Sequence, residues 1–148
     1  MRALLTATLC LAALPALSQP IDVSFCDWES SARNLGEPWE DYTRTFSNGK
    51  TRLAMLDTIE PAAGAVRMLV LSPPYDELGS RQCRTLGING MGFAGMNFDQ
   101  LSASYDPATG LDFTVPIQVW NSENDSYGPG TLWFRLNQAT GEITGRAN

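Results

Sequence analysis

Histidine is absent from this 148-residue chain, and cysteine occurs only three times. Without an imidazole group, acid–base catalysis would fall to carboxylates, since histidine is the side chain that normally titrates near neutral pH. Cys10 lies in the N-terminal segment, so Cys26 and Cys83 remain for the rest of the chain. With no histidine and no Cys-x-x-Cys pair to complete a ligand set, no metal site is expected.

Long hydrophobic runs are also lacking, with one exception at the N-terminus. Residues 3–14 carry no charge and follow a single basic residue, Arg2, while small residues occupy positions 16 and 18. This arrangement predicts a secretory signal peptide cleaved after Ser18; the alternative is a buried core helix. The apolar run is too short to span a bilayer. We expect a signal peptide over residues 1–18 and a single exported domain, periplasmic or extracellular, over residues 19–148.

Two cysteines remain after cleavage, and an even pair in an exported chain is typical of a disulfide. Closing a loop of the length between Cys26 and Cys83 stabilises the fold by about 4 kcal/mol in the chain-entropy model. The sequence therefore predicts a Cys26–Cys83 disulfide, and two free thiols are the alternative.

Positive charge is scarce. Removing Arg2 leaves nine basic residues against 16 acidic ones, a net charge of −7. Such a surface repels phosphate backbones and anionic membranes, so no nucleic-acid partner is expected. No transmembrane segment is expected in the mature chain, and no cofactor is indicated. These features leave the oligomeric state open.

Strand signals dominate the mature chain. Alternating residues over 21–25 predict a short, half-buried strand. Asn48-Gly49 between the candidate strands 42–46 and 51–59 predicts a hairpin, because both turn residues tolerate a positive φ. Residues 65–71 are apolar on both faces apart from Arg67, which predicts a central strand. Other strands are expected over 81–88, 101–105, 111–119, 132–136 and 142–144, with a helical turn possible within 27–36.

The last third of the chain alternates most clearly. One face of the predicted hairpin is apolar and directed towards the core: Leu111, Phe113, Val115, Ile117, Val119, Leu132, Phe134 and Leu136. Pro116 cannot donate a ladder hydrogen bond, so an edge or a bulge is expected at that position.

A short turn sequence occurs twice in this region. Asp106-Pro-Ala-Thr-Gly110 and Asn137-Gln-Ala-Thr-Gly141 each place a capping Asp or Asn four residues before a glycine. The ten residues 136–145 are similar to the closing hairpin of cadherin-like and immunoglobulin-like bacterial surface repeats. This resemblance implies a β-hairpin.

The stretch MLVLSPPYDEL, residues 68–78, resembles the catalytic motif of amino-directed DNA methyltransferases. In that family the Ser, the Pro backbone and the Tyr hold a flipped-out base, which would assign these roles to residues 72–75. A methyltransferase also needs a glycine-rich cofactor loop on a doubly wound sheet. The one candidate loop, Gly92-Phe93-Ala94-Gly95, lacks the required spacing. We therefore predict that Pro73 and Pro74 end a central strand and that 75–79 form the loop back.

Residues 121–130, NSENDSYGPG, faintly resemble the start of a calcium loop through Asn121, Glu123 and Asp125. Ser126 stands at the sixth position, where a calcium loop has glycine, and Leu132 stands at the twelfth, where it has glutamate. A solvated loop between two strands is expected instead.

Four outward side chains of the C-terminal hairpin form the candidate binding site: Gln118, Trp120, Trp133 and Arg135. They share one face if the two strands pair directly. Exposed tryptophan beside arginine is the composition of a recognition patch or of a platform on which sugars stack. The alternative is that the second sheet or the N-terminal segment covers them.

The sequence thus predicts an all-β domain, an antiparallel sandwich or small barrel of about nine short strands. The expected function is non-catalytic binding of an exported protein, a glycan or an envelope component, with an inhibitor as one version. No catalytic residue can be singled out. The alternative is a carboxylate-based hydrolase acting on an envelope polymer.

Overall fold

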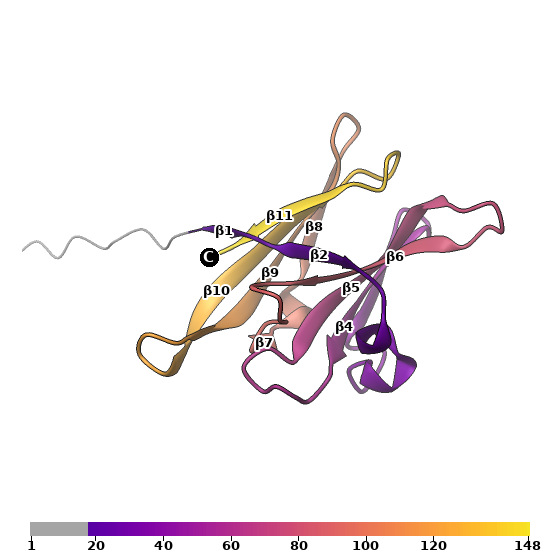
Figure 1. Cartoon of the computed structure of the whole chain (residues 1–148). Coiled ribbons are helices and arrows are strands. Elements are labelled where there is room, and N and C mark those ends of the chain that lie inside the picture. Colours follow the sequence, from indigo (N-terminus) through magenta and orange to yellow (C-terminus); the bar gives the residue numbers. More distant parts are fainter. Residues whose placement is uncertain (1–17) are drawn as a thin grey trace, which may run out of the picture.

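Two antiparallel β-sheets face one another in the computed structural model, which describes residues 18–148 (Figure 1). Sheet A contains β1 (Gln19–Pro20), β11 (Ile143–Ala147), β10 (Ser126–Leu136), β9 (Gly110–Asn121) and β7 (Gly95–Met96) in that order, with β8 (Ser102–Asp106) also paired to β9. Sheet B has the order β2 (Asp22–Phe25), β6 (Arg81–Gly87), β5 (Val66–Tyr75), β4 (Thr51–Asp57) and β3 (Thr43–Phe46). The predicted all-β class is confirmed, and of the two architectures offered the structure is the sandwich.

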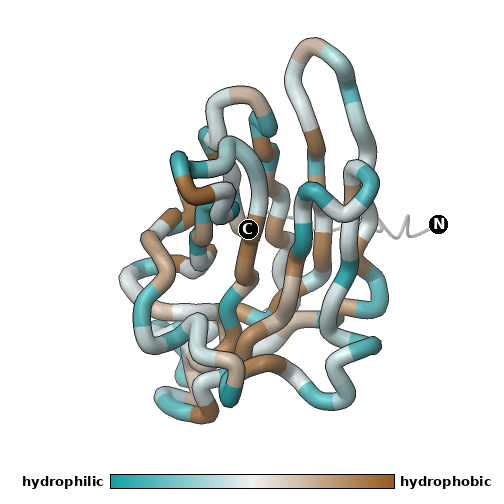
Figure 2. Tube along the Cα trace, turned by 90° about the vertical axis from the view of Figure 1, so that its right-hand side faces the viewer, coloured by the Kyte–Doolittle hydropathy of each residue, from teal (hydrophilic) through white to brown (hydrophobic). Residues whose placement is uncertain are grey.

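The core lies between the sheets and is built from the inward residues of the long strands. The hairpin of β9 and β10 places Phe134 opposite Phe113, and their rings stack with centroids 4.8 Å apart. Phe46 of β3 meets Phe113 edge-on at 5.0 Å, which joins the two sheets. The apolar alternation predicted for 111–119 and 132–136 is confirmed: every inward residue of these runs is buried except Val119, which is partly buried and packs against the core. Figure 2 shows hydrophobic stretches along the strands and hydrophilic residues at many of the turns.

The outer face of sheet B is covered by the chain between β2 and β3. Two short 3-10 turns, Trp28–Ser30 and Ala32–Asn34, lie in this segment, where the sequence allowed a helical turn. Leu35 packs with Cys26 and Cys83 against a small apolar cluster of β4 and β5. The predicted disulfide is confirmed, with the two Cα atoms 5.4 Å apart. It ties the start of the covering segment to β6.

The two copies of the repeated turn have the predicted conformation. The side chains of Asp106 and Asn137 each accept hydrogen bonds from backbone N–H groups two and three residues later. Gly110 and Gly141 have φ values of 104° and 77°, which are strained for any residue with a Cβ atom. Asn48 and Gly49 also have positive φ values, as expected between β3 and β4.

The burial expected for the first strand is wrong. β2 forms over nearly the predicted residues, but it is the edge strand of sheet B, and Phe25 remains 77% exposed. The Arg84 guanidinium lies 4.0 Å from the centre of the Phe25 ring. An alternating pattern identifies the two faces of a strand, whereas the cover over an edge strand depends on the opposite sheet.

The prediction that Pro73 and Pro74 end the central strand is also wrong in its boundary. β5 continues to Tyr75, and its register with β6 shifts between Ser72 and Tyr75. An irregularity of this kind accommodates residues that cannot donate ladder hydrogen bonds. The strand is central in sheet B, as predicted.

Pro116 lies neither at a sheet edge nor in a bulge, contrary to the expectation. It pairs with Thr131 of β10 in regular register. On its other side the carbonyl accepts a hydrogen bond from Asn97 N–H, so the proline nitrogen faces that side too. There β7 gives way to β8, with the 3-10 turn Phe98–Gln100 between them. The Pro116 nitrogen, which has no hydrogen to donate, therefore faces the gap between β7 and β8, where no strand needs its hydrogen bond.

The predicted signal peptide lies outside the described residues, apart from Ser18. Among residues 18–148, no helix is long and apolar enough to cross a membrane.

Candidate functional site

The outer face of sheet A carries the four predicted site residues. β9 and β10 pair directly, and their register puts Gln118, Trp120, Trp133 and Arg135 on the side away from the core. All four remain partly or fully exposed. Of the two alternative covers, sheet B packs on the inner face of sheet A, and the chain between β2 and β3 packs on the outer face of sheet B.

Trp133 is the centre of the more structured part of this face. Its ring centre lies 4.5 Å from the Arg146 guanidinium of β11 and 5.5 Å from that of Arg135. Arg146 stands directly opposite Trp133 in the ladder between β10 and β11. Cation–π contacts of this kind hold the indole in place while leaving part of its surface open to a partner.

Arg135 forms an ion pair with an acidic neighbour on the same face. Its Nε and a terminal nitrogen donate to the two carboxylate oxygens of Asp112 at 2.7 and 2.8 Å, a bidentate pair across β9 and β10. The hydrogen bond from Arg135 lowers the pKa of the Asp112 carboxyl, against the opposing effect of desolvation. The same bond raises the pKa of Arg135. Arg135 is thus a fixed element of the face, and its charge is already matched.

We expect the Asp112 pKa to rise towards the ordinary aspartate value in Arg135→Ala, because the main cause of its depression is removed. The contribution of the pair to stability is present above the unfolded-state pKa of about 3.9 and is lost as pH falls below it. Carboxyl titration by NMR measures the shift. Asp76 is the control, since backbone N–H groups, Ser80 first, lower its pKa. A shift at both residues, or at neither, would contradict the assignment.

Trp120 belongs to a separate cluster at the other end of the face. It meets Tyr127 edge-on with ring centroids 4.9 Å apart, next to the turn between β9 and β10. Tyr127 and Trp133 are six positions apart in β10, which is about 20 Å along a strand. The predicted site is therefore two aromatic clusters on one face. A groove of about 590 Å³ adjoins the Trp120–Tyr127 cluster, and Gln118, Tyr127 and Pro129 line it together with residues of β7.

Sequence reasoning missed two residues of this face, Arg146 and Tyr127. The expected terminal strand stopped near residue 144, whereas β11 runs to Ala147 and brings Arg146 beside Trp133. Tyr127 was assigned to a loop, but β10 begins at Ser126. Strand alternation could have indicated Tyr127, since it is an even number of residues from Trp133 and therefore points to the same outer face.

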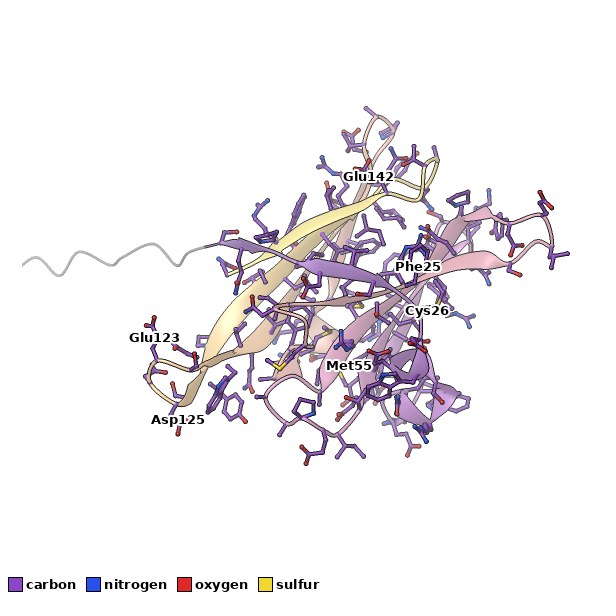
Figure 3. All side chains as sticks on the ribbon, viewed as in Figure 1. Phe25, Cys26, Met55, Glu123, Asp125 and Glu142 are labelled. Carbon is purple, nitrogen blue, oxygen red and sulfur yellow. A yellow bond between two sulfur atoms is a disulfide. The ribbon has the colours of Figure 1, made fainter. Side chains whose placement is uncertain are left out.

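The turn between β9 and β10 is exposed, as predicted for a solvated loop. Glu123 and Asp125 project outward from it (Figure 3). The Asn121 side chain accepts a hydrogen bond from the backbone N–H of Glu123 at 2.8 Å, so it caps the turn. In the part of the chain that the structure describes, no group of three or more His, Cys, Asp or Glu residues is placed to hold a metal ion.

The Ser-Pro-Pro-Tyr stretch begins with a buried residue and ends with an exposed one. Ser72 is fully buried, and its hydroxyl accepts a hydrogen bond from the Gln82 side chain at 2.8 Å. Tyr75 is exposed on the strand end. The serine therefore serves the packing between β5 and β6, and the surrounding fold is an antiparallel sandwich in place of a doubly wound sheet.

No family model matches the chain, and neither a curated protein nor a solved structure matches it in sequence or fold comparison.

Proposed function

We propose that this chain is an exported, non-catalytic binding domain that takes a protein partner on the outer face of sheet A. The observation that carries the proposal is Trp133, which is partly exposed on a sheet face that no segment of residues 18–148 covers and contacts the guanidinium groups of Arg146 and Arg135.

Export is supported by two independent features. The N-terminal residues have the composition of a signal peptide, and the domain contains a disulfide, which persists in oxidising compartments.

The shape of the face favours a protein partner. Two long strands present a broad surface with aromatic residues at both ends, and Trp, Tyr and Arg are the residues that most often dominate protein–protein binding energy. Within residues 18–148 Arg146 makes no ion pair, whereas Arg135 is paired with Asp112. An acidic side chain of the partner would match Arg146 and add to the contact with Trp133. A protein inhibitor would bind its enzyme through such a surface.

The test is a capture experiment with the mature, untagged protein coupled through its carboxylates and incubated with envelope extract of the producing cell. We expect a specific partner, identified by mass spectrometry and purified, to bind wild-type protein and to lose at least about tenfold in affinity with Trp133→Ala, as for a hot-spot residue.

The matched control is Trp39→Ala. Trp39 is 57% exposed and lies in the segment between β2 and β3, away from sheet A. Its replacement should leave binding unchanged. If Trp133→Ala binds as well as wild type, or if both variants lose binding equally, the outer face of sheet A is not the site.

A further inference from the structure

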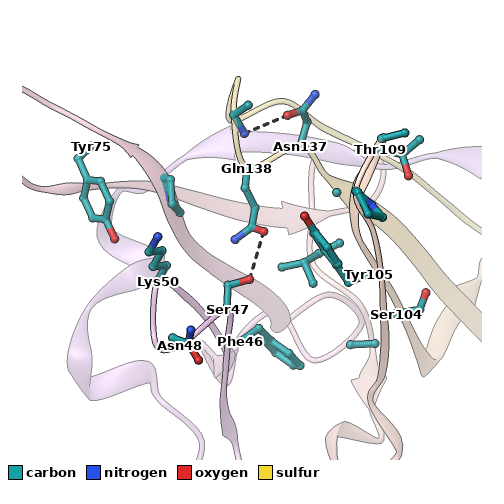
Figure 4. A pocket seen from close by; sticks show the side chains of 17 residues that line it. Phe46, Ser47, Asn48, Lys50, Tyr75, Ser104, Tyr105, Thr109, Asn137 and Gln138 are labelled. Carbon is teal, nitrogen blue, oxygen red and sulfur yellow. Dashed lines mark hydrogen bonds between the residues drawn. The ribbon is translucent and has the colours of Figure 1, made fainter.

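One end of the sandwich forms an open groove, here called the end groove. It is lined by the turns that follow β3, β8 and β10 and by the end of β5 (Figure 4). Its volume is about 950 Å³, within the range of about 300–1,000 Å³ typical of ligand-binding clefts. Both copies of the repeated Asp/Asn-x-Ala-Thr-Gly turn contribute to its walls.

Two exposed tyrosines from different sheets stand at the end groove. Tyr105 of β8 is 63% exposed, and Tyr75 at the end of β5 is 46% exposed. Figure 4 shows them on opposite sides, with Lys50, Ser47 and Gln138 between them. Each ring offers an apolar face and a hydroxyl group, a combination suited to a ligand that is both apolar and polar.

The polar floor of the end groove is held in place by hydrogen bonds between distant parts of the chain. Gln138 accepts from the Ser47 hydroxyl at 3.1 Å and donates to the Thr51 hydroxyl at 3.0 Å. Arg81 donates to the backbone carbonyls of Gly49 and Lys50, which fixes the turn after β3. The end groove is therefore formed before a ligand arrives, which lowers the ordering cost of binding.

The side chains that line the end groove are mostly neutral. Its polar groups are hydroxyls and amides, which both donate and accept hydrogen bonds. Among the described residues that line it, Lys50 is the one charged residue and none is Asp or Glu. The end groove is thus lined without a carboxylate, although the chain carries a net charge of −6.

From these observations we propose that the end groove binds an oligosaccharide. The C–H faces of pyranose rings would pack on Tyr105 and Tyr75, and ring hydroxyls would both donate to and accept from amides such as that of Asn137. The Asn137 side-chain oxygen already caps its own turn, and within residues 18–148 its NH₂ group makes no hydrogen bond, so it can donate to a ligand. This site is separate from the outer face of sheet A and stands or falls independently of it.

The experiment is an NMR titration of the full mature protein with cellohexaose, chitohexaose, maltohexaose, xylohexaose and hexagalacturonate at millimolar concentration. We expect at least one to bind saturably, with chemical-shift changes confined to residues of the end groove. Tyr105→Ala should weaken that binding about tenfold, the loss of one stacking contact, whereas Tyr105→Phe should retain most of it.

The matched control is Tyr127→Ala, because Tyr127 is 52% exposed at the opposite end of β10 and should not affect affinity. Unchanged thermal midpoints confirm that all three variants are folded. The proposal is overturned if none of the five oligosaccharides binds, if the shifts map to the outer face of sheet A, or if Tyr105→Ala binds as well as wild type.

Discussion

Replacing Phe134 with alanine is expected to lower the free energy of unfolding by about 3–5 kcal/mol. Phe134 is fully buried and stacks on Phe113, which in turn meets Phe46 of the opposite sheet. Removing the ring therefore opens a cavity in the middle of the sandwich, where strands on both sides are held by other contacts and cannot close it. Chemical denaturation followed by tryptophan fluorescence and circular dichroism measures the loss.

Trp133→Ala is the matched control, because Trp133 is the preceding residue and points to the other side of the same strand. We expect it to cost about 1 kcal/mol, the value of its contacts with two guanidinium groups. Equal losses in the two variants would mean that Trp133 is buried in solution, and the outer face of sheet A would then lack its central binding residue.

Removing the disulfide is expected to have an effect of similar size. The bond joins residues 57 apart in sequence, and closing such a loop is worth about 4 kcal/mol in the chain-entropy model. The double replacement of Cys26 and Cys83 by serine should lower the unfolding free energy by about this amount. It should also increase hydrogen exchange in the segment between β2 and β3, which the bond holds on sheet B.

Reduced wild-type protein is the comparison for the double variant, because it loses the same covalent link without the serine hydroxyls. Before reduction, protein that begins at residue 19 should give no reaction with a thiol reagent. One equivalent of label per chain, or a double variant as stable as the oxidised protein, would refute the structural role of the bond.

Local pattern was sufficient to predict much of the fold. The alternation over 111–119 and 132–136 specified which residues face the core, because a strand places successive side chains on opposite faces. Asn48-Gly49 and the two repeated turns located three hairpins, since few residues tolerate a positive φ.

Features that depend on distant partners were not predictable from pattern. The exposure of Phe25 reflects the position of β2 at a sheet edge. The regular place of Pro116 depends on the change of partner from β7 to β8 beside it.

The candidate sites also have features that the sequence pattern predicted and features that depend on contacts between distant parts of the chain. Strand alternation predicted that Trp120 and Trp133 lie on one face. Arg146 is beside Trp133 only because of the register between β10 and β11. The end groove depends on contacts such as Ser47 with Gln138, which lie 91 residues apart in sequence. No periodicity within one strand contains that information.

The pairing of β1 with β11 matters for the handling of the protein. Gln19 lies opposite Ala147, so the predicted start of the mature chain and residues 147–148 lie side by side in sheet A, next to Arg146. An affinity tag or fusion partner attached at either end would lie beside Trp133 and could mask the outer face, whichever terminus was chosen. The end groove is formed by turns at the other end of β10, so the same tag would leave it accessible. Tagged and untagged preparations are therefore expected to differ in protein capture and to agree in oligosaccharide binding.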